Sequence, residues 1–207
     1  MLDPNADILN RAVHLMRSSW SATLLYDQSP FDSRCMIDPR SGVFIMSIVP
    51  DALDANDIVL AAPRDSYETQ IRISVTLDAT VSEEQQDRFT AYHIPASTPL
   101  LACAKMVYAK LDSGEVVTDE QCSLSNPLIS KMPSLCRALN SDRDRLSRIC
   151  ASMTGVSHET PIAVGVDDRG IDIRARFGLV RCGFDTPIEN IDEAPDRIAS
   201  MMESADA

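Results

Sequence analysis

The three histidines are the side chains best suited to ligate a metal or to carry a proton near neutral pH. His93 lies at the end of a predicted helix, on one stripe with Phe89 and Tyr92 at helical spacing. It is therefore the best candidate for a metal ligand or a polar pocket residue. The alternative is that His93 caps its helix or hydrogen-bonds within the core. His14, on a predicted N-terminal helix, and His158, in a predicted loop, are expected to be structural or solvated.

The six cysteines offer a second set of potential ligands, but their spacing does not support one. No two form a CxxC pair, which is the spacing typical of zinc sites. We expect reduced thiols, most of them buried and behaving as small hydrophobic side chains. They are Cys35, Cys103, Cys122, Cys136, Cys150 and Cys182.

Basic residues gather in the second half of a chain whose net charge is −12. They could bind the carboxylate or phosphate groups of a ligand, or an acidic partner surface. The alternative is that Asp142 and Asp144 pair with them on a solvated helix face. The basic residues are Lys131, Arg137, Arg143, Arg145, Arg148, Arg174, Arg176 and Arg181.

Several function classes are excluded by composition and motif. The acidity disfavours sequence-independent nucleic-acid binding, which depends on Lys and Arg. The start of the chain lacks a secretory pattern, and no apolar run approaches membrane-spanning length, so we expect a cytoplasmic protein. No Ser-His-Asp or Cys-His nucleophile arrangement, P-loop or GxGxxG motif is present.

The elements that must position these side chains begin with a run of short strands. The run 70–79 alternates cleanly, with Ile71, Ile73, Val75 and Leu77 on one face. Strands at this spacing predict a small antiparallel barrel over residues 1–124. The expected strands are 21–26, 34–37, 43–49, 58–62, 70–79, 105–111 and 115–118, with a turn at 28–30.

Residues 125–207 form the second part, a compact α+β module. Its clearest element is a hairpin within 161–184, where Asp167-Asp168-Arg169-Gly170 separates two strand-like runs. The fold class is therefore α+β, an antiparallel split β-barrel followed by a small C-terminal α+β module. Helices are expected at 6–19, from Ser82 to about His93, over 126–155 with a break at Pro133, and at 192–202.

The order of these elements resembles the FMN-binding split-barrel superfamily, which is pyridoxamine 5′-phosphate oxidase-like. The closer likeness is to its haem-utilisation branch, the HugZ/HutZ-type proteins and their plant relatives. Three pieces carry it: QDRFTAYHIPAS at 86–97, KMVYAKLDSGEVV at 105–117, and PSLCRALNSDRDRL at 133–146 joined to VGVDDRGIDIRARFGLVRCGF at 164–184.

This resemblance implies a homodimer with a ligand pocket at its interface. It implies haem binding, and oxidative haem degradation with O2 and external electrons as an extension. Arg34, His93 and Arg143 would line or flank the pocket, with His93 as the iron ligand. Arg143 stands where the branch often has a His, and a guanidinium cannot ligate iron.

Two other functions stay open. The first is an FMN-dependent oxidoreductase with Arg34 on the flavin phosphate. Against it, Asp51, Asp54 and Asp57 fall where the superfamily binds that phosphate, and their carboxylates would repel it. The second is a non-catalytic dimeric split-barrel protein that has lost its cofactor grips and binds another protein, as plant relatives do.

Overall fold

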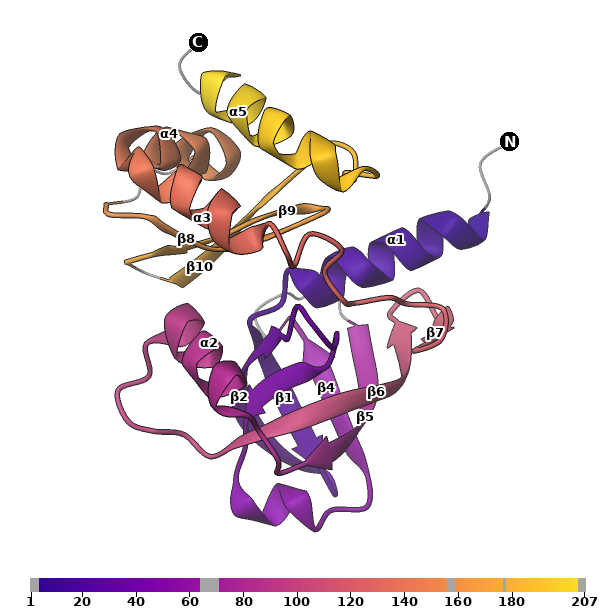
Figure 1. Ribbon diagram of the computed structural model, residues 1–207. Coiled ribbons are helices and arrows are strands. Elements are labelled where there is room, and N and C mark those ends of the chain that lie inside the picture. Colours follow the sequence, from indigo (N-terminus) through magenta and orange to yellow (C-terminus); the bar gives the residue numbers. More distant parts are fainter. Residues whose placement is uncertain (1–3, 64–70, 156–158, 177, 205–207) are drawn as a thin grey trace. The chain divides into compact units, whose positions relative to one another are not determined.

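A computed structural model describes residues 4–63, 71–155, 159–176 and 178–204 (Figure 1). The chain divides into two compact units, residues 1–125 and 126–207. Each unit has its own hydrophobic core.

The first unit is built on a closed antiparallel barrel of six strands. The order β3-β2-β1-β4-β5-β6 closes because β3 also pairs with β6, and β7 extends the sheet beyond β6. The strands are β1 (Ser21–Tyr26), β2 (Ser29–Ile37), β3 (Phe44–Ser47), β4 (Ile58–Ala62), β5 (Ile71–Asp78), β6 (Leu101–Leu111) and β7 (Val116–Thr118). The α+β fold class predicted from the sequence is thus confirmed.

Period-two alternation explains why these segments form strands around one core. On β5, Ile71, Ile73 and Val75 point inward and are at most 5% exposed, whereas Arg72 and Thr76 point outward. The inward residues of all the barrel strands share one cluster with the apolar face of α1 (Pro4–Arg17). That helix packs against the barrel (Figure 1), with Ala12, Val13 and Met16 buried.

The turn between β1 and β2 lies earlier than the sequence suggests. Asp27 and Gln28 both have positive φ, 43° and 72°, and β2 already begins at Ser29. A two-residue hairpin loop with both central residues at positive φ matches the twist of the strands it joins. The predicted turn at 28–30 was therefore displaced, because Ser29 and Pro30 pair with β1.

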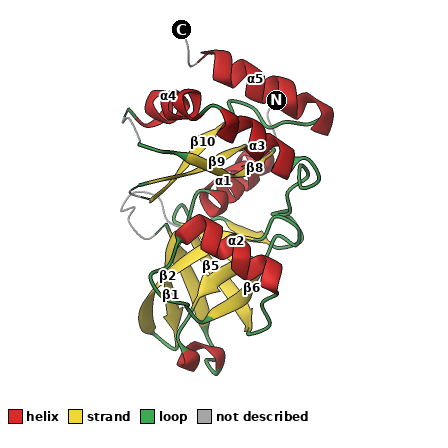
Figure 2. Ribbon diagram, turned by 60° about the vertical axis from the view of Figure 1, so that its left-hand side comes forward, coloured by secondary structure: helices red, strands yellow, loops and turns green. Residues whose placement is uncertain are grey.

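The second unit is a three-stranded antiparallel sheet with helices packed on one face (Figures 1 and 2). Its strands are β8 (Ile162–Asp167), β9 (Gly170–Ala175) and β10 (Gly178–Gly183), in the order β10-β9-β8. The helices are α3 (Met132–Ser141), α4 (Arg143–Thr154) and α5 (Ala194–Ser204), the last preceded by a 3₁₀ turn at Ile191–Glu193. The hairpin predicted within 161–184 is confirmed by the pairing of β8 with β9.

Pro133 does not break a helix, contrary to the sequence-based expectation. It lies in the first turn of α3, where a backbone N–H would have no partner in any case. The break falls at Asp142 instead, whose side chain accepts a 3.0 Å hydrogen bond from the Arg145 N–H and so caps α4.

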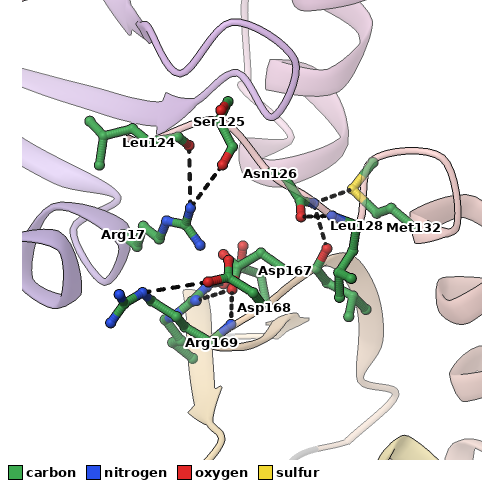
Figure 3. A network of polar contacts seen from close by, with 12 residues as sticks. Arg17, Leu124, Ser125, Asn126, Leu128, Met132, Asp167, Asp168 and Arg169 are labelled. Carbon is green, nitrogen blue, oxygen red and sulfur yellow. Dashed lines mark hydrogen bonds and ion pairs between the residues drawn. The ribbon is translucent and has the colours of Figure 1, made fainter. Parts of the chain in front are cut away.

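The connector between the units is held by a different side chain on each side (Figure 3). Within the first unit, buried Arg17 donates to the carbonyl of Ser125 at 3.1 Å and lies 3.5 Å from that of Leu124. Within the second, the Asn126 amide donates to the Val166 carbonyl at 2.7 Å and accepts from the Leu128 N–H.

Among the described residues, no helix has both the length and the apolar composition of a membrane-spanning segment.

Candidate functional site

Arg34 and His93, two of the residues predicted to bind a ligand, lie together where β2 meets the end of α2 (Glu83–His93). The Arg34 Nη1 donates to the His93 carbonyl at 3.1 Å, and the His93 Nε2 lies 3.0 Å from the Cys35 carbonyl. The helix α2 contacts β2, and Figure 2 shows it on the outside of the barrel. The two residues are 59 positions apart in sequence. The Arg34 side chain bonds the backbone of His93, and the His93 side chain bonds the backbone of Cys35, the neighbour of Arg34.

Local sequence fixes the position of His93. Ser82 and Gln85 form a capping box at the start of α2, with bonds of 3.3 and 2.9 Å. Phe89 and Tyr92 are both buried, 1% and 8% exposed. The helix ends at Ile94, in the left-handed region at φ 40°. The stripe of Phe89, Tyr92 and His93 predicted from the sequence is confirmed.

The hydrogen bond to Cys35 sets the tautomer of His93. A carbonyl only accepts, so Nε2 carries the proton and Nδ1 carries the lone pair of a neutral imidazole. Burial lowers the pKa of His93 to about 4; the Cys35 carbonyl opposes this shift and the Arg34 charge adds to it. His93 is therefore neutral at pH 7, the form in which imidazole ligates a metal.

Arg34 is exposed, and among the residues that the structure describes its guanidinium bonds the His93 carbonyl alone. The bond to the His93 carbonyl uses one of the five N–H donors that a guanidinium carries. Beside it lies Ile94, 63% exposed. The site thus combines a neutral imidazole, a cation able to bind a carboxylate, and an apolar surface.

The residues do not fit FMN. Ser33, the neighbour of Arg34, is buried and donates its hydroxyl proton to the Ser47 carbonyl at 2.7 Å, so it is not presented to a phosphate. Asp51, Asp54 and Asp57 are all exposed on the segment where the superfamily would contribute a second phosphate grip. Three carboxylates there would repel a phosphate dianion.

The donor chemistry fits haem better than a free metal ion. Within the described ranges, no group of three or more His, Cys, Asp or Glu side chains could hold a metal ion. Haem iron needs only one or two protein ligands, and neutral His93 can supply one. Cys35 cannot compete, because burial raises the pKa of its thiol to about 12. His14 is exposed on α1, and His158 lies outside the described residues.

Arg143 belongs to the second unit, where it is the exposed first residue of α4. Two residues of the motif before it have structural roles. The Asn140 amide exchanges two hydrogen bonds with the Ala163 backbone, at 2.8 and 2.9 Å, and Asp142 caps α4. This part of the motif therefore builds the module, whatever Arg143 binds.

Sequence reasoning missed a buried ionic network in the second unit. Arg181 on β10 donates to Asp167 on β8 and to Asp172 on β9, both at 2.6 Å. Burial acts to lower the pKa of Arg181, but the charges of Asp172 and Asp167 outweigh it, so the net shift is upward. The hairpin predicted from the sequence joins β8 to β9, whereas Asp172 and Arg181 pair across β9 and β10, so the prediction did not bring these two residues together.

The rest of the basic cluster is also largely paired. Lys131 bonds Asp192, Arg145 lies 3.6 Å from Asp142, and Arg176 lies 3.4 Å from Glu159. Next to the network, Asp168 and Arg169 form a further pair at 3.6 Å (Figure 3).

The cysteines are free thiols, and four of the six are buried, as expected.

No family model and no curated protein matches this sequence. Among solved structures, the chain is similar to a protein of unknown function from Agrobacterium tumefaciens, with a TM-score of 0.72 and 16% identity over 98% of both chains. A haem-binding protein from Mycobacterium smegmatis aligns over 100% of this chain and 99% of its own, with a TM-score of 0.43 and 17% identity. The likeness to the Agrobacterium protein extends over nearly the whole of both chains. This chain therefore shares with that protein the fold of a barrel followed by a small module.

Proposed function

We propose that this chain binds haem, and does so as a homodimer of the haem-utilisation type. The observation that carries the proposal is the Arg34–His93 pair, in which a neutral imidazole with a lone pair on Nδ1 stands beside a guanidinium with unused donors. The sequence motifs at 86–97, which contains His93, and at 105–117 resemble the haem-utilisation branch and also support it.

Each residue has a role matched to its chemistry. His93 would ligate the iron through Nδ1, because Nε2 is bonded to the Cys35 carbonyl. Arg34 would bind a propionate, and Arg143 is proposed as a second cation flanking the pocket of the dimer. Haem, when bound, would supply the oxidative chemistry with O2 and external electrons. We place the protein in the cytoplasm, where its free cysteines stay reduced.

Absorption spectroscopy of the full chain titrated with hemin tests this function. The wild type is expected to shift the Soret band with saturation at one haem per binding site, and His93→Gln to lose the histidine-ligated spectrum. His14→Gln is the matched control, since it removes an exposed histidine from the same unit and should change nothing.

Four results would contradict the proposal in different ways. A wild-type chain with no Soret shift at micromolar protein would exclude haem binding. A His93→Gln spectrum identical to the wild type would move the iron ligand elsewhere. Uptake of added FMN in place of hemin would favour the flavin alternative, and binding of neither cofactor would favour a non-catalytic interaction protein.

A further inference from the structure

The outer face of β6 has an irregularity that exposes two adjacent apolar side chains. The pairing of β5 with β6 shifts between Ser74 and Val75, because Tyr108 lies opposite Ser74 whereas Met106 lies opposite Val75. Val107 is the extra residue of a β-bulge. As a result Val107 and Tyr108 are both exposed, 47% and 45%, although regular alternation would bury one of them.

Two cations lie directly opposite each other in the next row of the same face. Arg72 on β5 pairs in register with Lys110 on β6, and Lys110 pairs with Val116 on β7. Like charges directly opposite on a sheet are destabilising. In the described part of the chain, neither cation forms a hydrogen bond or an ion pair with another side chain.

These residues form one patch, which we call the β6 surface: Arg72, Val107, Tyr108, Lys110 and Val116. Its positive charge stands out because the whole chain carries −12. The neighbouring Lys105 already has a partner, as its Nζ lies 4.0 Å from Asp119. A contiguous surface that exposes apolar side chains beside cations is typical of a site that binds another protein.

We propose that the β6 surface docks an acidic segment of a partner protein that also carries aromatic or aliphatic side chains. Carboxylates of the segment would relieve the repulsion between Arg72 and Lys110, and its apolar side chains would cover Val107, Tyr108 and Val116. Charge disfavours a second copy of this chain as the occupant. A two-fold interface would set the Arg72–Lys110 row of one copy against the same patch of the other.

Fluorescence anisotropy of the full chain with a labelled synthetic peptide of alternating Glu and Phe tests the proposal. The wild type is expected to bind this peptide, with an affinity that falls as salt is added. Lys110→Glu should weaken binding by about tenfold or more, and Tyr108→Ser should weaken it without any change of charge. Arg137→Glu is the matched control, because it changes the net charge equally at an exposed site in the second unit.

Several outcomes would overturn the proposal. A peptide with Gln in place of Glu that binds equally well would remove the role of charge. A loss of binding in Arg137→Glu as large as in Lys110→Glu would show an effect of net charge alone. Sedimentation in which Tyr108→Ser converts a dimer into a monomer would assign the β6 surface to a second copy. None of these outcomes depends on haem binding.

Discussion

Two strand arginines, Arg34 in the first unit and Arg181 in the second, show how differently one side chain can be used. Arg181 is 5% exposed and lies between Asp167 and Asp172, with a 2.6 Å bond to each. Arg34 is exposed, and within the described ranges its guanidinium has a single partner, the backbone carbonyl of His93. Both were candidates for binding an anionic ligand on the basis of sequence alone.

The two arginines differ in whether their charge is already balanced by carboxylates. The charge of Arg181 is balanced by carboxylates of its own unit, so this arginine ties β8, β9 and β10 together. The charge of Arg34 is not balanced by its carbonyl partner, so a ligand carboxylate can still gain from it. Stability and binding should therefore respond in opposite ways when each arginine is replaced.

The largest expected effect is on stability, from Arg181→Met. Removing the guanidinium takes away the cation that Asp167 and Asp172 both bond, and their side chains are only 13% and 12% exposed. Breaking a buried ion pair in this way costs about 3–5 kcal/mol of unfolding free energy. Urea denaturation of the full chain measures this loss.

Arg176→Met supplies the control for that measurement. Its pair with Glu159 is 68% and 80% exposed, so its loss should cost less than about 1 kcal/mol. If Arg181→Met is as stable as Arg176→Met, the buried network has no structural role and the contrast between the two arginines fails.

A second prediction concerns the pH dependence that His93 gives to the first unit. The pKa of His93 is lowered from 6.5 to about 4 in the folded chain, so between these values the unfolded chain binds a proton that the folded chain does not. The free energy of unfolding should therefore rise as pH increases from about 4 to 6.5 and level off above that window. It should fall again as pH decreases through the window. The change across the whole window is about 3 kcal/mol.

Denaturation midpoints of wild type and His93→Gln across that pH window provide the measurement. The Gln amide can still donate to the Cys35 carbonyl but does not titrate, so the variant should lose most of the slope. His14→Gln, which changes an exposed residue, should keep it. A wild-type slope that survives in His93→Gln would assign the titration to another group.

The smallest expected effect on stability is that of Arg34→Gln. Its bond to the His93 carbonyl is exposed, so replacement should cost less than about 1 kcal/mol. Hemin affinity should nevertheless fall, because the propionate partner is gone. Thermal melting and hemin titration of the same preparation separate the two effects. A large loss of stability with unchanged affinity would make Arg34 a structural residue like Arg181.

Much of the fold follows from local patterns in the sequence. The strands 21–26 and 58–62 agree with the structure residue for residue, because each is a short, mainly apolar run followed directly by turn-forming residues. The turn at 27–28 and the role of Pro133 were misplaced, since both depend on backbone conformations that residue type indicates only weakly. The domain boundary near residue 124 stays a proposal.

The candidate site was predictable in part. Helical spacing identified His93 with Phe89 and Tyr92, but its bond to Cys35 depends on how α2 lies against β2, a contact between distant segments. The Arg181 network was missed for the same reason, because Asp167 joins it from a third strand. The bulge at Val107 depends on a register shift between β5 and β6, which no single strand encodes.

The position of the connector between the two units matters for segmental isotope labelling of this protein. Ser125 is held by Arg17, and Gly42 approaches it so closely that a Cβ there would come within 2.8 Å of the Ser125 nitrogen. Asn126 is held by the Val166 carbonyl of its own unit. We therefore expect the Ser125–Asn126 peptide to be a suitable place to join two separately expressed pieces of the chain. Isotope labelling of one piece alone would then let the spectrum of the barrel be recorded without that of the module.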